Sequence, residues 1–254
     1  MRNIWVIARN TLKLEIRDKI LYGLIVFALL YVFLTLFMAD LVLKELPMVK
    51  SFGLTGIYFF NALVALFLGT TSFFKDIDRK VAYFVISKPV SRAQFLLGKF
   101  LGLCMVLLLT SAILGAAYIG LILYEHGGFD MLGLLAIAMQ YLEMVLFIAF
   151  AIFVSTFSSS LLSIVYTSAV FFLGHVVSQL VSDAQQIGLG GVQLFLVKVL
   201  YYIFPNLEKF DARDLAVHAV AMPFAEFGLA FAYAAVYVAV LLFAATWIFD
   251  KKEM

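Results

Sequence analysis

Three polar residues stand inside long apolar runs, where they could line a path through a membrane. Glu143 and His175 are the only acidic or basic residues within 131–182, and Asn61 lies in an uncharged run of its own. A carboxylate at membrane depth is costly to bury, so Glu143 indicates a functional site that lines a path or responds to protons. The alternative is a structural hydrogen bond, for example to Gln140, with His175 as a partner of Glu143 or packing alone.

The competing interpretation is an enzyme with a serine nucleophile. Ser158, Ser159 and Ser160, with His175 or His218 as the base, would be the set for an intramembrane hydrolase. The serines are expected at a turn between two spans, however, with His175 well along the next span and His218 across the membrane. No G-x-S-x-G or H-E-x-x-H motif occurs. The sequence therefore favours a protein that is not an enzyme.

Acidic residues and a histidine gather late in the chain, at Glu208, Asp211, Asp214 and His218. They could bind a metal ion, but we favour a solvated loop, because Lys209 and Arg213 balance the acidic charge. The single cysteine, Cys104, lies in an apolar run, so no cysteine metal cluster is expected.

Composition places the chain in a membrane. Of its 254 residues, 65% are hydrophobic and 13% are charged, and the mean hydropathy is +1.08. Soluble domains carry about 25% charged residues. The net charge of +2 is too small to indicate a nucleic-acid partner. We therefore expect an all-α integral membrane protein with a single transmembrane domain over 1–254.

A helix needs roughly 20 apolar residues to cross a hydrocarbon core of about 30 Å. By this measure six spans are expected, at about 20–40, 52–74, 100–124, 132–156, 160–182 and 226–249. Pro223 interrupts the last apolar run, because proline lacks a backbone donor and disfavours helix at the preceding residue. The segment 183–225 holds an apolar stretch that is too short to cross, so we expect an external re-entrant segment there.

Positive charge predicts the orientation of these spans. If the N-terminus is cytoplasmic, the cytoplasmic segments hold 13 of the 18 lysines and arginines. We therefore expect a multi-pass protein of the cell membrane, either a bacterial inner membrane or a plasma membrane, with both termini in the cytoplasm. The first apolar stretch is longer than a signal peptide's and lacks a small-x-small site behind it, so it should stay in the mature protein.

The N-terminal segment 1–19 has the pattern of an amphipathic helix. Its cations share one stripe, at Arg2, Arg9, Lys13 and Arg17. Trp5 lies on the apolar side, and such a helix lies among lipid headgroups with its cations toward anionic lipid. Glu15 falls on the wrong face and weakens the pattern. The alternative is a topology signal with no further role.

The segment 75–99 has the pattern of a structured cytoplasmic loop. A short helix is expected within 77–86, and Pro89 ends it. Ser91 and Gln94 form a capping-box pair, which predicts a second helix that begins at Ser91 and runs into the third span. Two short helices with a break between them, exposing apolar residues ringed by charge, suit docking into a groove of a soluble partner. A surface helix that only obeys the positive-inside rule is the alternative.

The stretch VAYFVISKPVSRAQFLLGKFLG, residues 81–102, resembles the cytoplasmic loop of ABC-transporter permeases of the type 2 exporter family. The matching positions are Ser87, Pro89, Ser91, Arg92, Gly98 and Lys99. FPNLEKFDARD, residues 204–214, is similar to the family's external Pro-Asn stretch. The order of the N-terminal helix, the spans and the segment before the last span extends the resemblance over the whole chain.

This resemblance implies a permease that encloses a membrane path with a second copy, or with a homologous permease, and that two soluble ATPase subunits drive. The coupling helix and its frame would comprise Asp76, Asp78, Arg79, Val81, Phe84, Ser87, Pro89, Ser91 and Arg92. No G-x-x-x-x-G-K-[ST] motif occurs, so the partner would bind ATP and Mg²⁺ and no cofactor is expected in this chain. The family favours export. The substrate stays open, as does a membrane scaffold or sensor without transport.

Overall fold

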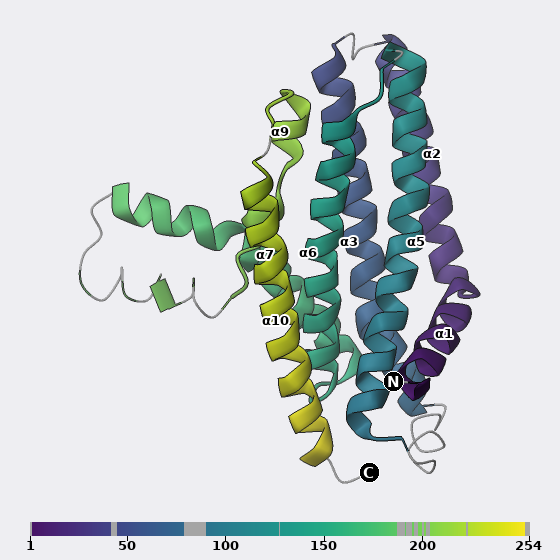
Figure 1. Cartoon of the computed structure of the whole chain (residues 1–254), viewed down its shortest axis with the longest axis vertical. Helices are drawn as coiled ribbons and strands as arrows, with labels where there is room; N and C mark the ends of the chain where they lie inside the picture. The colour runs from purple at the N-terminus through teal and green to yellow at the C-terminus, as the bar shows by residue number, and fades with distance from the viewer. Residues whose placement is uncertain are drawn as a thin grey trace.

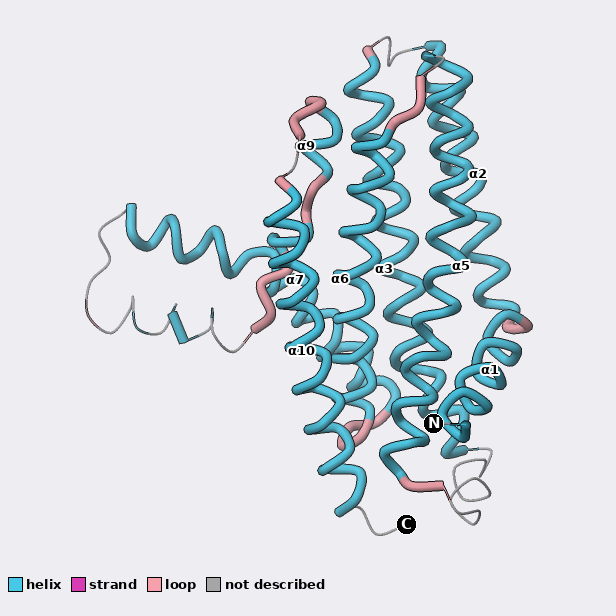
Figure 2. The backbone as a smooth tube through the Cα atoms, viewed as in Figure 1, coloured by secondary structure: helices cyan, strands magenta, loops and turns pink. Residues whose placement is uncertain are grey.

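The computed structural model describes residues 2–41, 45–78, 90–126, 128–186, 204–221 and 223–251, with positions 191, 195, 198, 199 and 201 between them. Within these residues the chain is helical and has no strand, as Figure 2 shows in cyan. The long helices are α1 (Arg2–Ile16), α2 (Lys19–Leu41), α3 (Leu46–Asp78), α5 (Arg92–His126), α6 (Met131–Ser155), α7 (Ser160–Gln186) and α10 (Phe224–Lys251). A 3₁₀ turn, η1 (Glu208–Phe210), and a short helix, α9 (Arg213–Val217), precede α10.

Five helices in this part of the chain are long and apolar enough to cross a membrane, and the number is six if the bent pair of α1 and α2 counts as one span. The axes of α1 and α2 meet at 63°. The chain is therefore an all-α membrane protein. A helix covers each of the six apolar segments that the sequence predicts, and a tight turn at 156–159 joins α6 to α7.

The helices α3, α5 and α6 run side by side along the long axis, with α10 packed on α6 and α2 packed on α3 (Figure 1). Helix α9 lies at one end of the bundle, which we call the α9 end (Figure 1). Helix α1 and the last turn of α10 lie toward the other end, which we call the α1 end (Figure 1). The last turns of α7 extend sideways from the bundle (Figure 1).

Helix α1 packs tightly on α5. A Cβ atom on Gly98 would lie 2.7 Å from the Cβ of Ile7, and one on Gly102 would lie 2.7 Å from the carbonyl oxygen of Ala8. These two glycines, four residues apart, let the two backbones approach closely, as small residues do between membrane helices. The predicted amphipathic helix is therefore present, and it is held by protein contacts on the face opposite its exposed cations.

Glu15 has a structural role that the sequence interpretation missed. Its side chain is buried, and it accepts a hydrogen bond from the hydroxyl of Ser72 in α3. Glu15 therefore lies on the face opposite the exposed cations, as the sequence indicates, and it does not disrupt the packing there because Ser72 of α3 meets its carboxylate.

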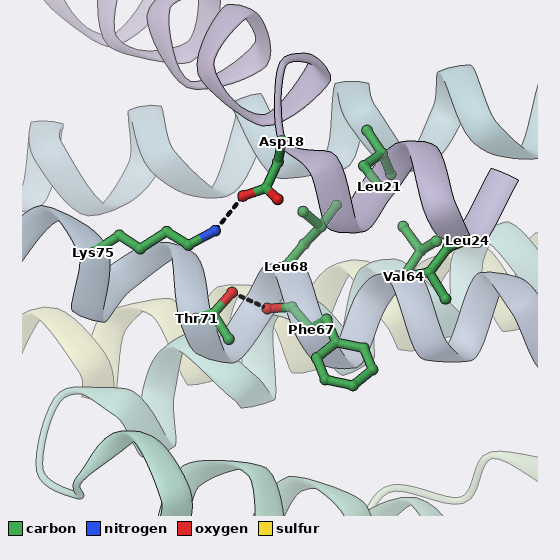
Figure 3. A pocket seen from close by; sticks show the side chains of 8 residues that line it. All are labelled: Asp18, Leu21, Leu24, Val64, Phe67, Leu68, Thr71 and Lys75. Atoms are coloured by element: carbon green, nitrogen blue, oxygen red, sulfur yellow. Dashed lines mark hydrogen bonds and ion pairs between the residues drawn. The ribbon is translucent and has the colours of Figure 1, made fainter.

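A second polar contact joins the bend between α1 and α2 to α3. Figure 3 shows Asp18 at this bend pointing toward Lys75, with which it forms an ion pair, beside a small apolar pocket. Thr71 lies on the same pocket and donates a hydrogen bond of 2.6 Å to the carbonyl of Phe67 in its own helix (Figure 3). Two polar contacts therefore hold the α1 end of α3 to the N-terminal helices.

The start of α5 confirms the predicted capping box. The backbone N–H of Gln94 donates to the Ser91 hydroxyl over 3.2 Å, and the backbone N–H of Ser91 donates to the Gln94 side chain over 3.4 Å. Arg92 then donates to the carbonyl oxygens of Phe249 and Asp250, and its guanidinium carbon lies 5.6 Å from the centre of the Phe249 ring. Arg92 therefore caps the carboxyl end of α10 and ties it to the start of α5.

Arg92→Gln is expected to lower the free energy of unfolding by about 1 to 2 kcal/mol, because hydrogen bonds from a charged donor and its favourable interaction with the carboxyl end of a helix are lost. Thermal unfolding of the purified protein measures the effect. Arg9→Gln, on the exposed face of α1, is the matched control. Equal melting temperatures for the two variants would show that Arg92 does not hold α10.

Candidate functional site

A buried polar cluster forms where α3, α6 and α7 meet. Glu143 lies on α6, which packs between α3, α7 and α10, so its carboxylate is away from both lipid and water with 1% of the side chain exposed. The Tyr58 hydroxyl, from α3, donates to Glu143 Oε1 over 2.8 Å. His175, from α7, places Nε2 at 2.6 Å from the Tyr58 hydroxyl and at 3.2 Å from Glu143 Oε1. We call Tyr58, Glu143 and His175 the polar cluster.

The polar cluster holds two protons among three closely spaced atoms. His175 Nδ1 is 2.9 Å from the carbonyl of Phe171, which can only accept, so Nδ1 carries a proton. Nε2, the Tyr58 hydroxyl and Glu143 Oε1 then need two protons between them, because one proton would leave two lone pairs facing each other. The second proton resides on His175 or on Glu143, so the polar cluster is an ion pair or a neutral network of the same geometry.

One oxygen of Glu143 is left over. Oε2 is buried and makes no hydrogen bond to any described residue. A buried acceptor without a donor is costly, and in native proteins it is explained by an ordered water or ion, by strain or by a functional role. The polar cluster therefore has unused capacity to accept a hydrogen bond or a positive charge.

Arg213 and Asp211 lie beside the polar cluster at the α9 end. The guanidinium carbon of Arg213 is 4.5 Å from the centre of the Tyr58 ring, a cation–π contact. Arg213 Nε also donates to Asp211 Oδ1 over 2.8 Å. Burial alone would raise the pKa of Asp211, but the hydrogen bonds and charge of Arg213 outweigh it, with a further contribution from His175, and hold the pKa of Asp211 below its usual value. The pair is therefore ionised at neutral pH.

Close packing of the chain before α9 brings Arg213 to this position. The backbone N–H of Leu207 donates to the carbonyl of Gly174 over 3.1 Å, and a Cβ on Gly174 would lie 2.8 Å from the Leu207 side chain. Leu207 and Phe210 are buried. The segment therefore docks on α7 next to His175. This docking requires glycine at position 174, because a Cβ there would overlap the Leu207 side chain.

A family comparison covers this whole site. A profile described as a protein of unknown function, DUF2705, matches residues 44–254. The chain belongs to the DUF2705 family. No match was found among curated proteins. The residues matched to DUF2705 run from the start of α3 to the end of the chain, so they contain the polar cluster and Arg213, while α1 and α2 precede them.

Asn61, the third path residue predicted in this DUF2705 protein, is buried on α3, one turn from Tyr58. Neither atom of its amide has a hydrogen-bond partner among the described residues. Gln140, which the sequence suggested as a partner for Glu143, donates to the carbonyl of Leu54 over 3.4 Å instead. The structure therefore joins Glu143 to His175, as one of the sequence alternatives has it, and adds Tyr58 between them.

The predicted coupling residues fall at the edge of the described chain. Arg79, Val81, Phe84, Ser87 and Pro89 lie outside the described residues. Asp76 and Asp78 belong to the last turn of α3, and Ser91 and Arg92 begin α5 as described above. The coupling role of all nine residues stays a prediction.

Among the described residues, the side chains needed for a serine hydrolase or a metal site are not brought together. Ser158 and Ser159 lie in the turn between α6 and α7, and His175 is 15 residues beyond Ser160 on α7, roughly 22 Å along a helix. Helix α9, which His218 follows, lies toward the opposite end of the bundle (Figure 1). Within the described ranges, no three histidine, cysteine or acidic side chains are grouped to hold a metal ion. Asp211 is instead paired with Arg213, as the loop interpretation predicts.

Sequence reasoning missed Tyr58, Asp211 and Arg213 as parts of the site. Tyr58 stands in an aromatic stretch, GIYFFN, where a tyrosine gives no local sign of its partner. A usable signal is that Tyr58 and Asn61 are three residues apart and therefore share a helix face. That face places two polar side chains together in the middle of a mostly apolar span.

Proposed function

We propose that this DUF2705 protein is the permease subunit of an ABC transporter of the exporter type. It would have six spans and cytoplasmic termini, lie in the cell membrane, and form a path with a second copy or a homologous permease. Two soluble ATPase subunits would bind ATP and Mg²⁺ and dock on the loop 75–99. The resemblance of residues 81–102 to the coupling loop of that family motivates the assignment.

The observation that carries the proposal is how firmly the chain on either side of this loop is held. Helix α3 continues beyond its apolar span to Asp78, and α5 begins at Arg92 behind a capping box. The end of α3 is tied to α1 and to the bend that follows α1, through Ser72 and Lys75. Arg92 is tied to α10. A force applied between residues 78 and 91 would therefore act on four helices together.

Helix α3 would carry such a movement toward the polar cluster. Tyr58 stands on the same continuous helix as Ser72 and Lys75, and helices transmit displacement as rigid elements between packed neighbours. Docking and closure of an ATPase pair would then shift Tyr58 relative to Glu143 on α6. This supplies a physical link between ATP hydrolysis and the intramembrane site.

Affinity purification of the solubilised protein from its native membrane tests the proposal. A soluble subunit with a Walker A sequence is expected in equal copies. Val81→Asp and Phe84→Asp, which place charge on the apolar face of the predicted docking helix, should reduce its recovery by about tenfold or more, since a buried charge at an interface is strongly unfavourable.

The control is Asp214→Asn, at the α9 end, far from the predicted docking loop. An added aspartate such as Phe231→Asp is not used, because it would place a charge on an exposed face of a span. Its ATPase recovery should equal that of the natural sequence. The absence of any nucleotide-binding partner, under conditions that preserve the protein's oligomer, would contradict the proposal and favour a scaffold or sensor.

A further inference from the structure

An apolar pocket of about 130 Å³ lies between α3, α6 and α7. Its walls include Ala62 and Leu66 from α3, Phe147 from α6, and Ser168 and Phe171 from α7. Pockets that bind small molecules are mostly apolar and carry a few polar groups that fix orientation. The pocket itself is lined by apolar groups apart from Ser168, so any polar recognition must come from its surroundings.

The polar cluster supplies those surroundings. On each of the three helices, the cluster residue is four positions from a pocket residue: Tyr58 from Ala62, Glu143 from Phe147, and His175 from Phe171. Helices α3 and α6 run in one direction and α7 in the other, so all three steps lead the same way, toward the α1 end (Figure 1). The polar cluster therefore lies about one helical turn, roughly 6 Å, from the pocket on its α9 side.

Phe171 forms the wall that the pocket and the polar cluster share. Its ring centre is 6.0 Å from that of Tyr58, 4.8 Å from that of His175 and 5.1 Å from that of Phe147. Aromatic faces attract cations, and those of Tyr58 and Phe171 stand beside a buried carboxylate. The apolar pocket thus adjoins aromatic rings and the carboxyl group of Glu143.

A positive charge already stands at the outer edge of the polar cluster. The guanidinium of Arg213 covers one face of Tyr58 and is close enough to Glu143 for the two charges to attract. Asp211 holds Arg213 in this position, by accepting hydrogen bonds from both its side chain and its backbone N–H. Because the hydrogen bonds of Arg213 go to Asp211, Glu143 Oε2 still has no donor among the described residues and can accept one from a ligand.

We propose that the pocket and the polar cluster together bind an amphipathic organic cation. Its ammonium group donates a hydrogen bond to Glu143 Oε2, and its apolar body fills the pocket between Ala62, Phe147 and Phe171. Arg213 competes with the ammonium group for the carboxyl group of Glu143 and the ring face of Tyr58. The role of this cation as the transported substrate rests on the proposed function. Binding of the cation to the protein does not require an ATPase.

The test is equilibrium binding of dansylcadaverine, a fluorescent alkylamine, to the purified protein in nanodiscs of neutral phosphatidylcholine. N-Acetylated dansylcadaverine is the matched ligand, with the same apolar body and no charge. We expect the acetylated ligand to bind about tenfold more weakly or worse, because a hydrogen bond to a charged partner is lost. Equal affinity for the two ligands would overturn the proposal.

Three variants locate the binding. Glu143→Gln should weaken amine binding by about tenfold while leaving the acetylated ligand unaffected. Arg213→Gln should strengthen amine binding, a gain that misfolding cannot produce. Glu226→Gln, which removes an exposed carboxylate at the start of α10, should change neither affinity. Unchanged amine binding in Glu143→Gln, or unchanged or weaker amine binding in Arg213→Gln, would overturn the proposal.

The outcomes separate this inference from the proposed function. Recovery of an ATPase partner from a protein that binds neither ligand would overturn the cation site and leave the permease standing. Charge-dependent binding of dansylcadaverine, by a protein that recovers no ATPase partner, would support the site and contradict the permease.

Discussion

Gly102→Leu is expected to detach α1 from α5 and to lower the free energy of unfolding by about 3 kcal/mol, the upper part of the usual range for overpacking. A Cβ at position 102 would lie 2.6 Å from the Cβ of Thr11 and 2.7 Å from the carbonyl oxygen of Ala8. The carbonyl belongs to the backbone of α1 and cannot rotate away. Helix α1 must therefore move as a whole to make room.

Movement of α1 would also break its polar contacts to α3. The Glu15 carboxylate would leave the Ser72 hydroxyl, and Asp18 would be drawn from Lys75. Loss of the Glu15–Ser72 contact adds to the packing cost, because both side chains are buried and a buried polar group left without a partner is penalised.

Thermal unfolding and limited proteolysis at α1 measure this effect. Gly120→Leu is the matched control, because Gly120 lies on the same helix and a Cβ added there would meet no atom within 4 Å. Gly102→Leu should unfold earlier and be cleaved within α1, whereas Gly120→Leu should match the natural sequence. Equal behaviour of the two variants would show that α1 is not held through the glycine face of α5.

Local sequence patterns predicted the helices well because each pattern contains its own physical cause. The start of α5 follows from Ser91 and Gln94, whose side chains satisfy each other's backbone N–H groups within one turn. The start of α10 at Phe224 follows from Pro223, which cannot continue a preceding helix. The apolar runs between charges likewise predicted the long helices, because the length and the hydropathy of a span can both be read from one segment of the sequence.

Contacts between distant segments could not be predicted in this way. Tyr58 is 85 residues from Glu143 and 117 from His175, so no local spacing links them. Glu15 and Ser72 are likewise 57 residues apart. The pattern of α1 predicted only that it is amphipathic, and lipid or protein could cover its apolar face.

A signal for the α1 contact was nevertheless present. Gly98 and Gly102 are four residues apart at the start of the third predicted span, the spacing at which small residues let membrane helices approach. The sequence interpretation used Gly98 only as part of the family motif. The motif glycine therefore has a packing role in this protein, against Ile7.

Asp130→Asn is expected to lower the free energy of unfolding by about 3 to 5 kcal/mol, because it leaves the ammonium group of Lys50 buried without an opposite charge. Lys50 Nζ is 3.0 Å from Asp130 Oδ1, with 10% and 5% of the two side chains exposed. Asp130 also accepts from the Tyr118 hydroxyl over 2.8 Å and from the backbone N–H of Gly133 over 3.1 Å. Asparagine keeps the shape of the side chain and one acceptor oxygen, so the loss of stability comes chiefly from the lost negative charge.

A double-mutant cycle with Lys50→Met separates the pair's own contribution from the penalty of breaking it. Thermal unfolding of the double variant should recover most of the stability, because an apolar side chain of similar volume replaces the buried cation. Asp214→Asn, at an exposed acid of α9, should change the stability by less than about 0.5 kcal/mol. A double variant no more stable than Asp130→Asn would show that the ion pair itself stabilises the fold. Recovery would mean that Lys50 and Asp130 chiefly align α3 with α6 at the end of the bundle nearest the polar cluster, at little net gain in stability.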